Sequence, residues 1–302
     1  MLNNTLSSTG GLAAITAAAV LASSSLSSAA VVNVEYDALT VTNGDTVWVN
    51  NVNSGSRDAS FGPGGLVTFA GDPSPTGIDA SVLFDGSNVG SITPSFNPTP
   101  DRASIEIWFK PALADASNFV DGVLFETGGA SKGLMVGING ATGSESPNNP
   151  NSIVAAIGGL LSADGKQILT VPLDISAADD FVHVVLTVGA DGSKLYVNGA
   201  LADSDATVND DWAGSNAGAL GGTGGGNLGA GGSTGSTILP GSGDDFEGEI
   251  GLFRFYGPDD NDVGALTAQE VSDLYLTVVP EPSSALMGIV GAGLLAVRRR
   301  RG

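Results

Sequence analysis

The chain has 302 residues, of which 42% are hydrophobic, and 32 acidic side chains outnumber 11 basic ones to give a net charge of −21 at pH 7. A surface this acidic excludes nucleic acid as a partner, because binding to phosphates requires basic side chains. The absence of cysteine excludes disulfides, thiolate metal sites and cysteine nucleophiles, and the single histidine, His183, excludes zinc sites built from several histidines.

Residues 1–30 have the features of an export signal. They contain no charged side chain, residues 12–21 (LAAITAAAVL) are apolar, and Ser28, Ala29 and Ala30 are small residues of the kind that a signal peptidase reads. A basic n-region is missing, since the first basic residue is Arg57. The sequence predicts a signal peptide over residues 1–30, and a disordered leader of small residues is the alternative.

The body of the chain, residues 31–278, is expected to form one all-β domain. Its many glycine, proline, asparagine and aspartate residues favour short strands joined by turns. HVVLTV (183–188) is apolar on both faces, as expected for a strand that is covered on each side, whereas SIEIWFK (104–110) alternates. Two stacked antiparallel sheets, forming a β-sandwich, explain both patterns.

Three further segments of the body are interpreted from their patterns. A strand is expected at residues 39–41, and residues 267–275 show a brief helical period. The stretch 213–243 is dominated by glycine, serine, threonine and asparagine, but strand-forming residues resume after it. It is therefore predicted to be a long loop within one domain.

Five stretches of the body occur in the order seen in LamG-like, concanavalin A-like jelly-roll domains. The resemblance implies the two-sheet antiparallel fold, a structural role for His183, and Phe181 at the position of a family tryptophan. The five stretches are FDG (84–86), SIEIWFKP (104–111), FVHVVLTVGADGSKLYVNGALA (181–202), FEGEIGLFRFY (246–256) and ALTAQEVSDLY (265–275).

The last two dozen residues, 279–302, resemble a PEP-CTERM protein-sorting tail. The resemblance implies that an exosortase-type transpeptidase cuts near the Pro-Glu-Pro motif after a short transmembrane helix has held the exported chain in the inner membrane. The apolar segment 285–297 is short against the roughly 20 residues of an ordinary span, and a plain anchor is the alternative. The elements are Pro280, Glu281 and Pro282, the apolar segment, and the stop formed by Arg298, Arg299, Arg300 and Arg301.

Recognition of glycans or of extracellular proteins is the activity that the jelly-roll resemblance implies. Exposed aromatic rings would stack on sugar faces, and Trp48, Trp212 and Tyr256 are the candidates. Trp212 is the foremost of the three because it lies in the polar stretch VNDDWAGSN. The alternative is that each ring is buried in the core.

One structural calcium ion is the cofactor that the resemblance implies. The family often holds it through an aspartate of its penultimate motif, and Gly251 occupies that position here. Asp85, Asp244, Asp245 and Glu247 could supply replacement oxygen ligands. The alternative is that these acidic residues form a solvated loop.

Catalysis is not expected from the sequence. A retaining glycoside hydrolase needs two carboxyl groups about 5–5.5 Å apart, and the nearest pair, Glu247 and Glu249, lacks a third carboxylate at Gly251. No G-x-S-x-G motif is present. The sequence therefore favours a non-enzymatic surface or matrix protein that binds carbohydrate or a matrix protein. The alternatives are a purely structural matrix protein and a divergent glycoside hydrolase.

Overall fold

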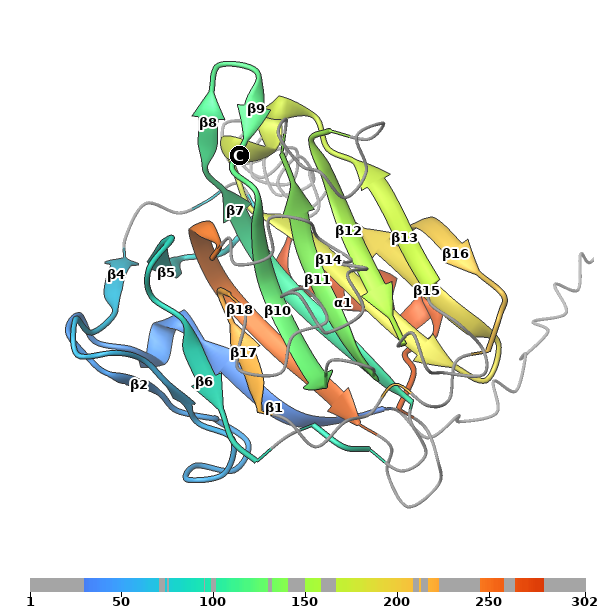
Figure 1. Ribbon diagram of the computed structural model, residues 1–302, viewed down its shortest axis with the longest axis horizontal. Coiled ribbons are helices and arrows are strands. Elements are labelled where there is room, and N and C mark those ends of the chain that lie inside the picture. Colours follow the sequence, from blue (N-terminus) through green and yellow to red (C-terminus); the bar gives the residue numbers. More distant parts are fainter. Residues whose placement is uncertain are drawn as a thin grey trace, which may run out of the picture.

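In the computed structural model, the described residues form two large antiparallel sheets and one α-helix (Figure 1). Sheet A has the strand order β16-β15-β14-β7-β18-β5-β4, and β1 pairs with the second half of β18. Sheet B has the order β13-β12-β11-β10-β17-β6-β3-β2. The structure describes residues 30–70, 74, 76–94, 96–98, 102–129, 132–140, 150–158, 167–208, 212, 217–222, 245–257 and 264–279.

Sheet A has eight strands and carries the residues of the site described below. The strands are β1 (Val31–Asp37), β4 (Val67–Ala70), β5 (Ala80–Asp85), β7 (Ala103–Pro111), β14 (Val182–Gly189), β15 (Gly192–Val197), β16 (Ala200–Asp205) and β18 (Glu247–Gly257). At 11 residues β18 is long enough to pair with β7 along one edge and with β5 and then β1 along the other.

Sheet B has eight strands, and four neighbouring strands at one end have only two or three residues each. Its strands are β2 (Val47–Trp48), β3 (Ala59–Ser60), β6 (Gly90–Ile92), β10 (Gly122–Gly129), β11 (Lys132–Asn139), β12 (Ser152–Ile157), β13 (Gln167–Pro172) and β17 (Gly218–Leu220). A small hairpin joins β8 (Leu113–Asp115) to β9 (Asn118–Phe119), and two 3-10 turns, η1 (Ala38–Thr40) and η2 (Ile175–Ala178), complete the described elements besides the helix.

Two expectations about local structure are wrong. Residues 39–41 do not form a strand, because Asp37 caps the turn η1 by accepting a hydrogen bond from the Leu39 backbone N–H. The predicted loop 213–243 contains β17, which pairs with β10 and β6 in the middle of sheet B. A strand of three residues is too short to produce a readable period.

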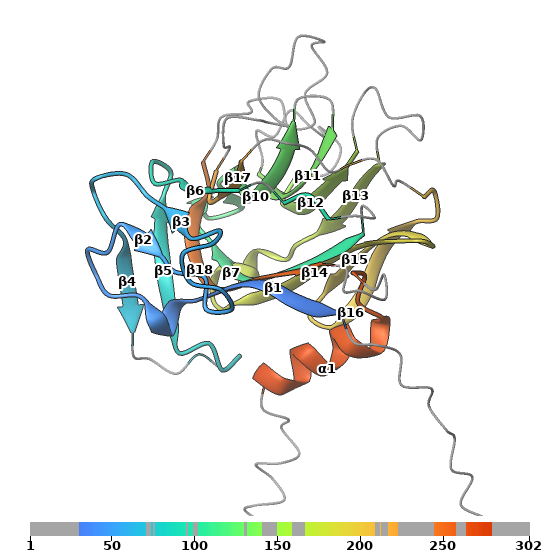
Figure 2. The same ribbon diagram turned by 90° about the horizontal axis from the view of Figure 1, so that it is seen from below.

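Alternation along the strands divides the apolar residues between two layers. On β7, Ile105, Ile107 and Phe109 enter the main core between the sheets, while Glu106 and Trp108 point to the outer face of sheet A. That outer face is covered by α1 (Ala268–Val278), which lies against sheet A on the side away from sheet B (Figure 2). The strand HVVLTV is thus covered on both faces, as its composition predicted.

Helix α1 is fixed at its start by backbone capping. Thr267 accepts a hydrogen bond from the Glu270 backbone N–H, and the Glu270 carboxylate accepts one from the Thr267 backbone N–H. The buried hydroxyl of Ser104 accepts a hydrogen bond from the Leu266 backbone N–H just before the helix. These contacts hold α1 in place above a polar cluster on sheet A.

Candidate functional site

Charged side chains gather on the outer face of sheet A, beneath α1. Glu106 on β7 is paired with Arg254 on β18 and with Val185 on β14. His183 on β14 is paired with Trp108 on β7. Because alternate residues of neighbouring strands share a face, this register brings the polar side chains together on one side of the sheet.

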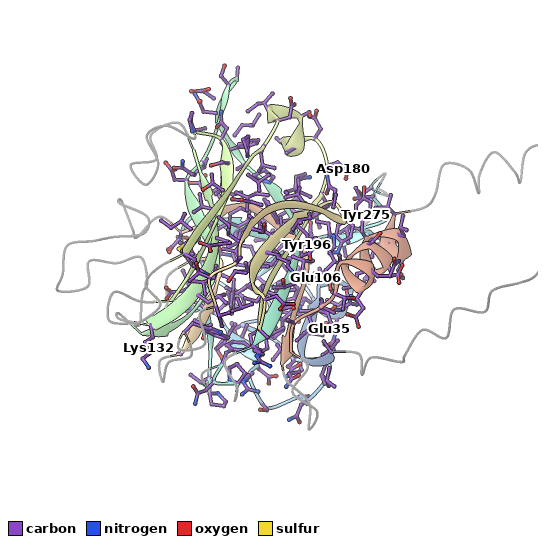
Figure 3. All side chains as sticks on the ribbon, turned by 90° about the vertical axis from the view of Figure 1, so that its right-hand side faces the viewer. Glu35, Glu106, Lys132, Asp180, Tyr196 and Tyr275 are labelled. Carbon is purple, nitrogen blue, oxygen red and sulfur yellow. The ribbon has the colours of Figure 1, made fainter. Side chains whose placement is uncertain are left out.

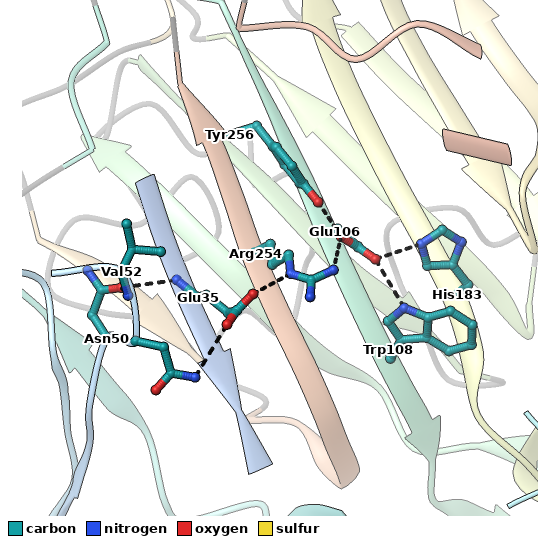
Figure 4. A network of polar contacts seen from close by, with 9 residues as sticks. Glu35, Asn50, Val52, Glu106, Trp108, His183, Arg254 and Tyr256 are labelled. Carbon is teal, nitrogen blue, oxygen red and sulfur yellow. Dashed lines mark hydrogen bonds and ion pairs between the residues drawn. The ribbon is translucent and has the colours of Figure 1, made fainter. Parts of the chain in front are cut away.

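The carboxylate of Glu106 is fully buried and is the centre of this cluster (Figure 4). Its Oε1 accepts hydrogen bonds from Trp108 Nε1 at 3.1 Å and from His183 Nε2 at 3.2 Å. Its Oε2 accepts one from the Tyr256 hydroxyl at 2.6 Å and one from Arg254 Nη1 at 3.3 Å. Four donors occupy the roughly four acceptor positions of a carboxylate, so Glu106 has none left for a substrate.

Arg254 connects the buried carboxylate to one nearer the surface. Its Nε donates to Glu35 Oε2 at 2.7 Å, and Glu35 is about one quarter exposed. The two carboxylates fix the plane of the guanidinium group, because its donors form a rigid fork. The side chain of Arg254 is therefore held in one orientation.

His183 lies in a stack of rings rather than in a catalytic arrangement. Its ring centre is 4.5 Å from that of Trp108 and 5.8 Å from that of Tyr275 on α1. Tyr275 and Glu106 lie close to the boundary between helix and sheet (Figure 3). The His183 backbone N–H donates to Asn198 Oδ1 at 3.1 Å. These contacts agree with the structural role expected for this residue.

The electrostatics of the cluster favour an ionised Glu106. Burial by itself raises its pKa, but the hydrogen bond and charge attraction of His183, the charge of Arg254 and the hydrogen bond from Tyr256 lower the pKa to about 2 from 4.5. Burial and the nearby Glu106 carboxylate raise the pKa of Tyr256, so its hydroxyl keeps the proton that it donates.

Unfolding free energy should consequently depend on acid pH through Glu106. Its folded pKa is depressed, so the stabilisation is complete above about pH 4.5 and is lost as the pH falls toward 2. The slope should approach roughly 1.4 kcal/mol per pH unit. Urea unfolding of the wild type and of Glu106→Gln between about pH 2 and pH 4.5 measures this pH dependence. The stability difference between them should shrink with falling pH, and a constant difference would contradict the assignment.

A pocket of about 260 Å³ opens beside Arg254. It is bounded by η1 and the end of β1, by residues 77–80 leading into β5, by β18 and by the last turn of α1. Asp37, Asp79 and Arg254 supply its charged groups. Sequence reasoning missed this pocket because its walls come from four separate segments. The alternation of SIEIWFK placed Glu106 and Trp108 on one face of the strand, but neither residue lines the pocket.

The three aromatic candidates for sugar stacking lie in the interior of the protein. Trp48 and Trp212 are fully buried in the main core between the sheets. Tyr256 is 3% exposed and packs beneath α1 while donating its hydroxyl to Glu106. None of the three presents a ring face to solvent, so the expectation that they are exposed sugar platforms is not met. Packing of large rings outweighed the polar sequence around Trp212.

The structure describes three of the four acidic residues that were considered as calcium ligands. Asp85 and Glu247 are partners across β5 and β18, and Asp245 lies two residues before Glu247. Asp244 lies outside the described residues. Among the residues that the structure describes, no three histidine, aspartate or glutamate side chains are grouped so that they could hold a metal ion. A calcium site at these residues stays a prediction.

Of the two carboxylates considered for hydrolysis, Glu249 has other partners. Glu249 forms an ion pair with Lys110 at 2.5 Å and accepts a hydrogen bond from the Ser81 hydroxyl at 2.6 Å. At Gly251 a Cβ atom would lie 2.4 Å from Ile78 Cγ2, so this packing leaves no room for the aspartate that the family carries there.

Both ends of the chain lie outside the described residues. The predicted signal peptide falls almost wholly within 1–29, and the Pro280–Pro282 motif, the apolar segment and Arg298–Arg301 fall within 280–302. None of the described residues form a helix with both the length and the hydrophobicity of a membrane span.

Comparison with protein families gives two matches. Residues 278–301 match the PEP-CTERM protein-sorting motif, which indicates export and sorting to the cell envelope. Residues 84–272, well over half of the chain, match the model of the concanavalin A-like lectin/glucanases superfamily. None of the curated proteins compared matches the chain.

Solved structures share the fold at low sequence identity. Domain 4 of an extracellular arabinanase from Geobacillus stearothermophilus, solved with arabinotriose, is 17% identical over 82% of this chain and 99% of that one, with a TM-score of 0.50. The binding domain of botulinum neurotoxin serotype D/C is 14% identical over 82% of this chain and 52% of that one, also with a TM-score of 0.50. With the family match over residues 84–272, the chain belongs to the concanavalin A-like lectin/glucanases superfamily.

Proposed function

We propose that this protein is an exported, non-enzymatic surface or matrix protein whose β-sandwich binds a neutral carbohydrate polymer. The observation that carries the proposal is the similarity to the arabinanase domain, because it covers 99% of a domain that was solved with a bound oligosaccharide. Membership of a superfamily named for its lectins and glucanases supports the same class of ligand.

Charge decides which carbohydrate is favoured. The chain has a net charge of −21, so its surface potential repels polyanions and does not oppose neutral glycans. Acidic polysaccharides would need bridging cations. One structural calcium ion remains part of this proposal as a cofactor, but the described Asp85, Asp245 and Glu247 are not grouped so that they could hold it by themselves. Neutral extracellular polysaccharide is therefore the expected ligand class.

A binding role rather than hydrolysis agrees with how the carboxylates are used. Glu106 accepts four hydrogen bonds, and Glu249 is occupied by Lys110 and Ser81. A general acid or nucleophile must instead reach the scissile bond with a free oxygen. Glu106 and Glu249 thus serve packing and ion pairing.

The sorting tail gives the proposed route to the surface. A signal peptidase would remove residues 1–30, and the apolar segment 285–297 would anchor the exported chain in the inner membrane. An exosortase-type transpeptidase would then cut near Pro280–Pro282 and release the sandwich to the cell surface or the extracellular matrix. The matching motif at residues 278–301 supports this order of events.

The test is a glycan array probed with the purified chain. Saturable binding to one class of neutral glycan, with no release of shorter sugars on prolonged incubation, is the expected result. Release of shorter sugars would favour the glycoside hydrolase alternative. Absence of binding to every glycan would contradict the proposal and favour a purely structural matrix protein.

A further inference from the structure

We infer that the pocket beside Arg254, named here the Arg254 pocket, holds one neutral sugar residue of the bound polymer; this rests on the proposed function. The pocket is lined by Asp37, Asp79, Arg254, Ile78, Leu252 and Val278, among others. Its volume of about 260 Å³ is just below the roughly 300–1,000 Å³ of sites for drug-sized ligands. A single sugar ring is a ligand of that size.

The polar groups of the pocket match the hydroxyl groups of a sugar. Arg254 is a donor that is already oriented by Glu35 and Glu106, so a ligand does not have to order it. Asp37 and Asp79 supply carboxylate oxygens, which accept hydrogen bonds from hydroxyl groups. Hydrogen bonds to charged groups are stronger than those between neutral groups. One donor group and two acceptor groups therefore face the same space.

The apolar side of the pocket suits the C–H face of a sugar ring. Leu252 belongs to a small cluster with Trp108 and Phe181, and Ile78 and Val278 pack against that cluster. Leu252 is only 6% exposed and Ile78 is half-buried, so the surface is backed by tightly packed side chains. A rigid apolar surface with a few convergent polar groups is typical of small-molecule sites.

The balance of charge selects against acidic sugars. Asp37 and Asp79 contribute two negative charges, and the single positive charge of Arg254 already faces Glu35 and Glu106. An added carboxylate or sulfate group would meet more negative than positive charge at close range. The Arg254 pocket should therefore accept neutral sugars and reject uronic acids.

Two variants of the full chain test the Arg254 pocket. Thr277→Trp fills the pocket from the last turn of α1, where Thr277 lines it and is exposed. Leu276→Trp is the matched control, because Leu276 is the exposed neighbour of Thr277 on that turn and is outside the lining. Asp79→Asn removes one charged acceptor, and Asp191→Asn, an exposed turn residue between β14 and β15, is its control.

Binding is measured by calorimetric titration with arabinotriose, xylotriose, cellotriose, maltotriose and, as the acidic probe, trigalacturonate. We expect each pocket variant to weaken binding of the preferred neutral sugar by about tenfold or more. Thr277→Trp should do so because the indole occupies the space of the sugar, and Asp79→Asn because a charged hydrogen bond is lost. The two controls should bind like the wild type. Unchanged binding in both pocket variants would overturn the inference alone. A preference for trigalacturonate, or a wild type that binds none of the sugars, would overturn the proposed function with it.

Discussion

Replacing Glu106 with alanine is expected to lower the free energy of unfolding by about 3–5 kcal/mol, the range for removing one partner of a buried ion pair. Glu106 is fully buried, and its loss leaves the Tyr256 hydroxyl, Trp108 Nε1 and Arg254 Nη1 without this acceptor. Urea unfolding followed by fluorescence measures the change. The midpoint should fall while the denaturant slope stays constant.

Glu35→Ala is the matched control, because Glu35 is the other carboxylate bound to Arg254. Glu35 is about one quarter exposed, and surface ion pairs contribute less than about 1 kcal/mol. The two variants thus remove the same kind of partner from the same guanidinium at different depths. Equal losses of unfolding free energy in the two variants would contradict the conclusion that Glu106 stabilises the fold more than Glu35 because it is buried.

Trp212→Ala should destabilise the protein by about 3–5 kcal/mol, as truncation of a buried tryptophan does. Trp212 is fully buried in the main core, so the substitution leaves a large cavity between the sheets. An exposed sugar platform would instead lose glycan binding at nearly unchanged stability. The midpoint of urea unfolding separates the two roles.

Leu201→Ala is the control for Trp212→Ala. Leu201 lies on the edge strand β16 and is 54% exposed, and changes at such positions are usually within about 0.5 kcal/mol. A Trp212→Ala midpoint close to that of Leu201→Ala would contradict the burial of Trp212.

The layers of the fold were predictable because they follow from the order of apolar and polar residues within single strands. The alternation of SIEIWFK divides β7 into an inner and an outer face, and the apolar composition of HVVLTV required cover on both sides of β14. The cover on the outer face is α1, which the helical period at 267–275 indicated. The family match over residues 84–272 agrees with the resemblance seen in the motifs.

The candidate site was not predictable from single stretches. Arg254 meets Glu106 across 148 positions of sequence and Glu35 across 219, and only the strand register brings them together. The surroundings of Trp212 misled for a related reason: a polar flank describes local exposure, whereas burial is decided by which sheet the ring packs against. A short stretch of sequence shows neither which strands pair nor how deeply a side chain is buried.

The proposed sugar site of this acidic β-sandwich is formed in part by a helix. Helix α1 covers the polar cluster of sheet A and, through Val278, contributes to the wall of the Arg254 pocket. The sorting motif begins at residue 278, at the end of this helix. The face that would bind sugar is therefore also the face from which the sorting tail leaves the domain.

The most direct test of the central claim is a calorimetric titration of the intact chain with the neutral glycan that the array selects, at low and at high salt. The account predicts saturable binding of one sugar chain per protein with an affinity that salt leaves nearly unchanged, because hydrogen bonds and packing rather than net charge hold the ligand. No measurable binding, or binding that disappears as salt rises, would contradict it.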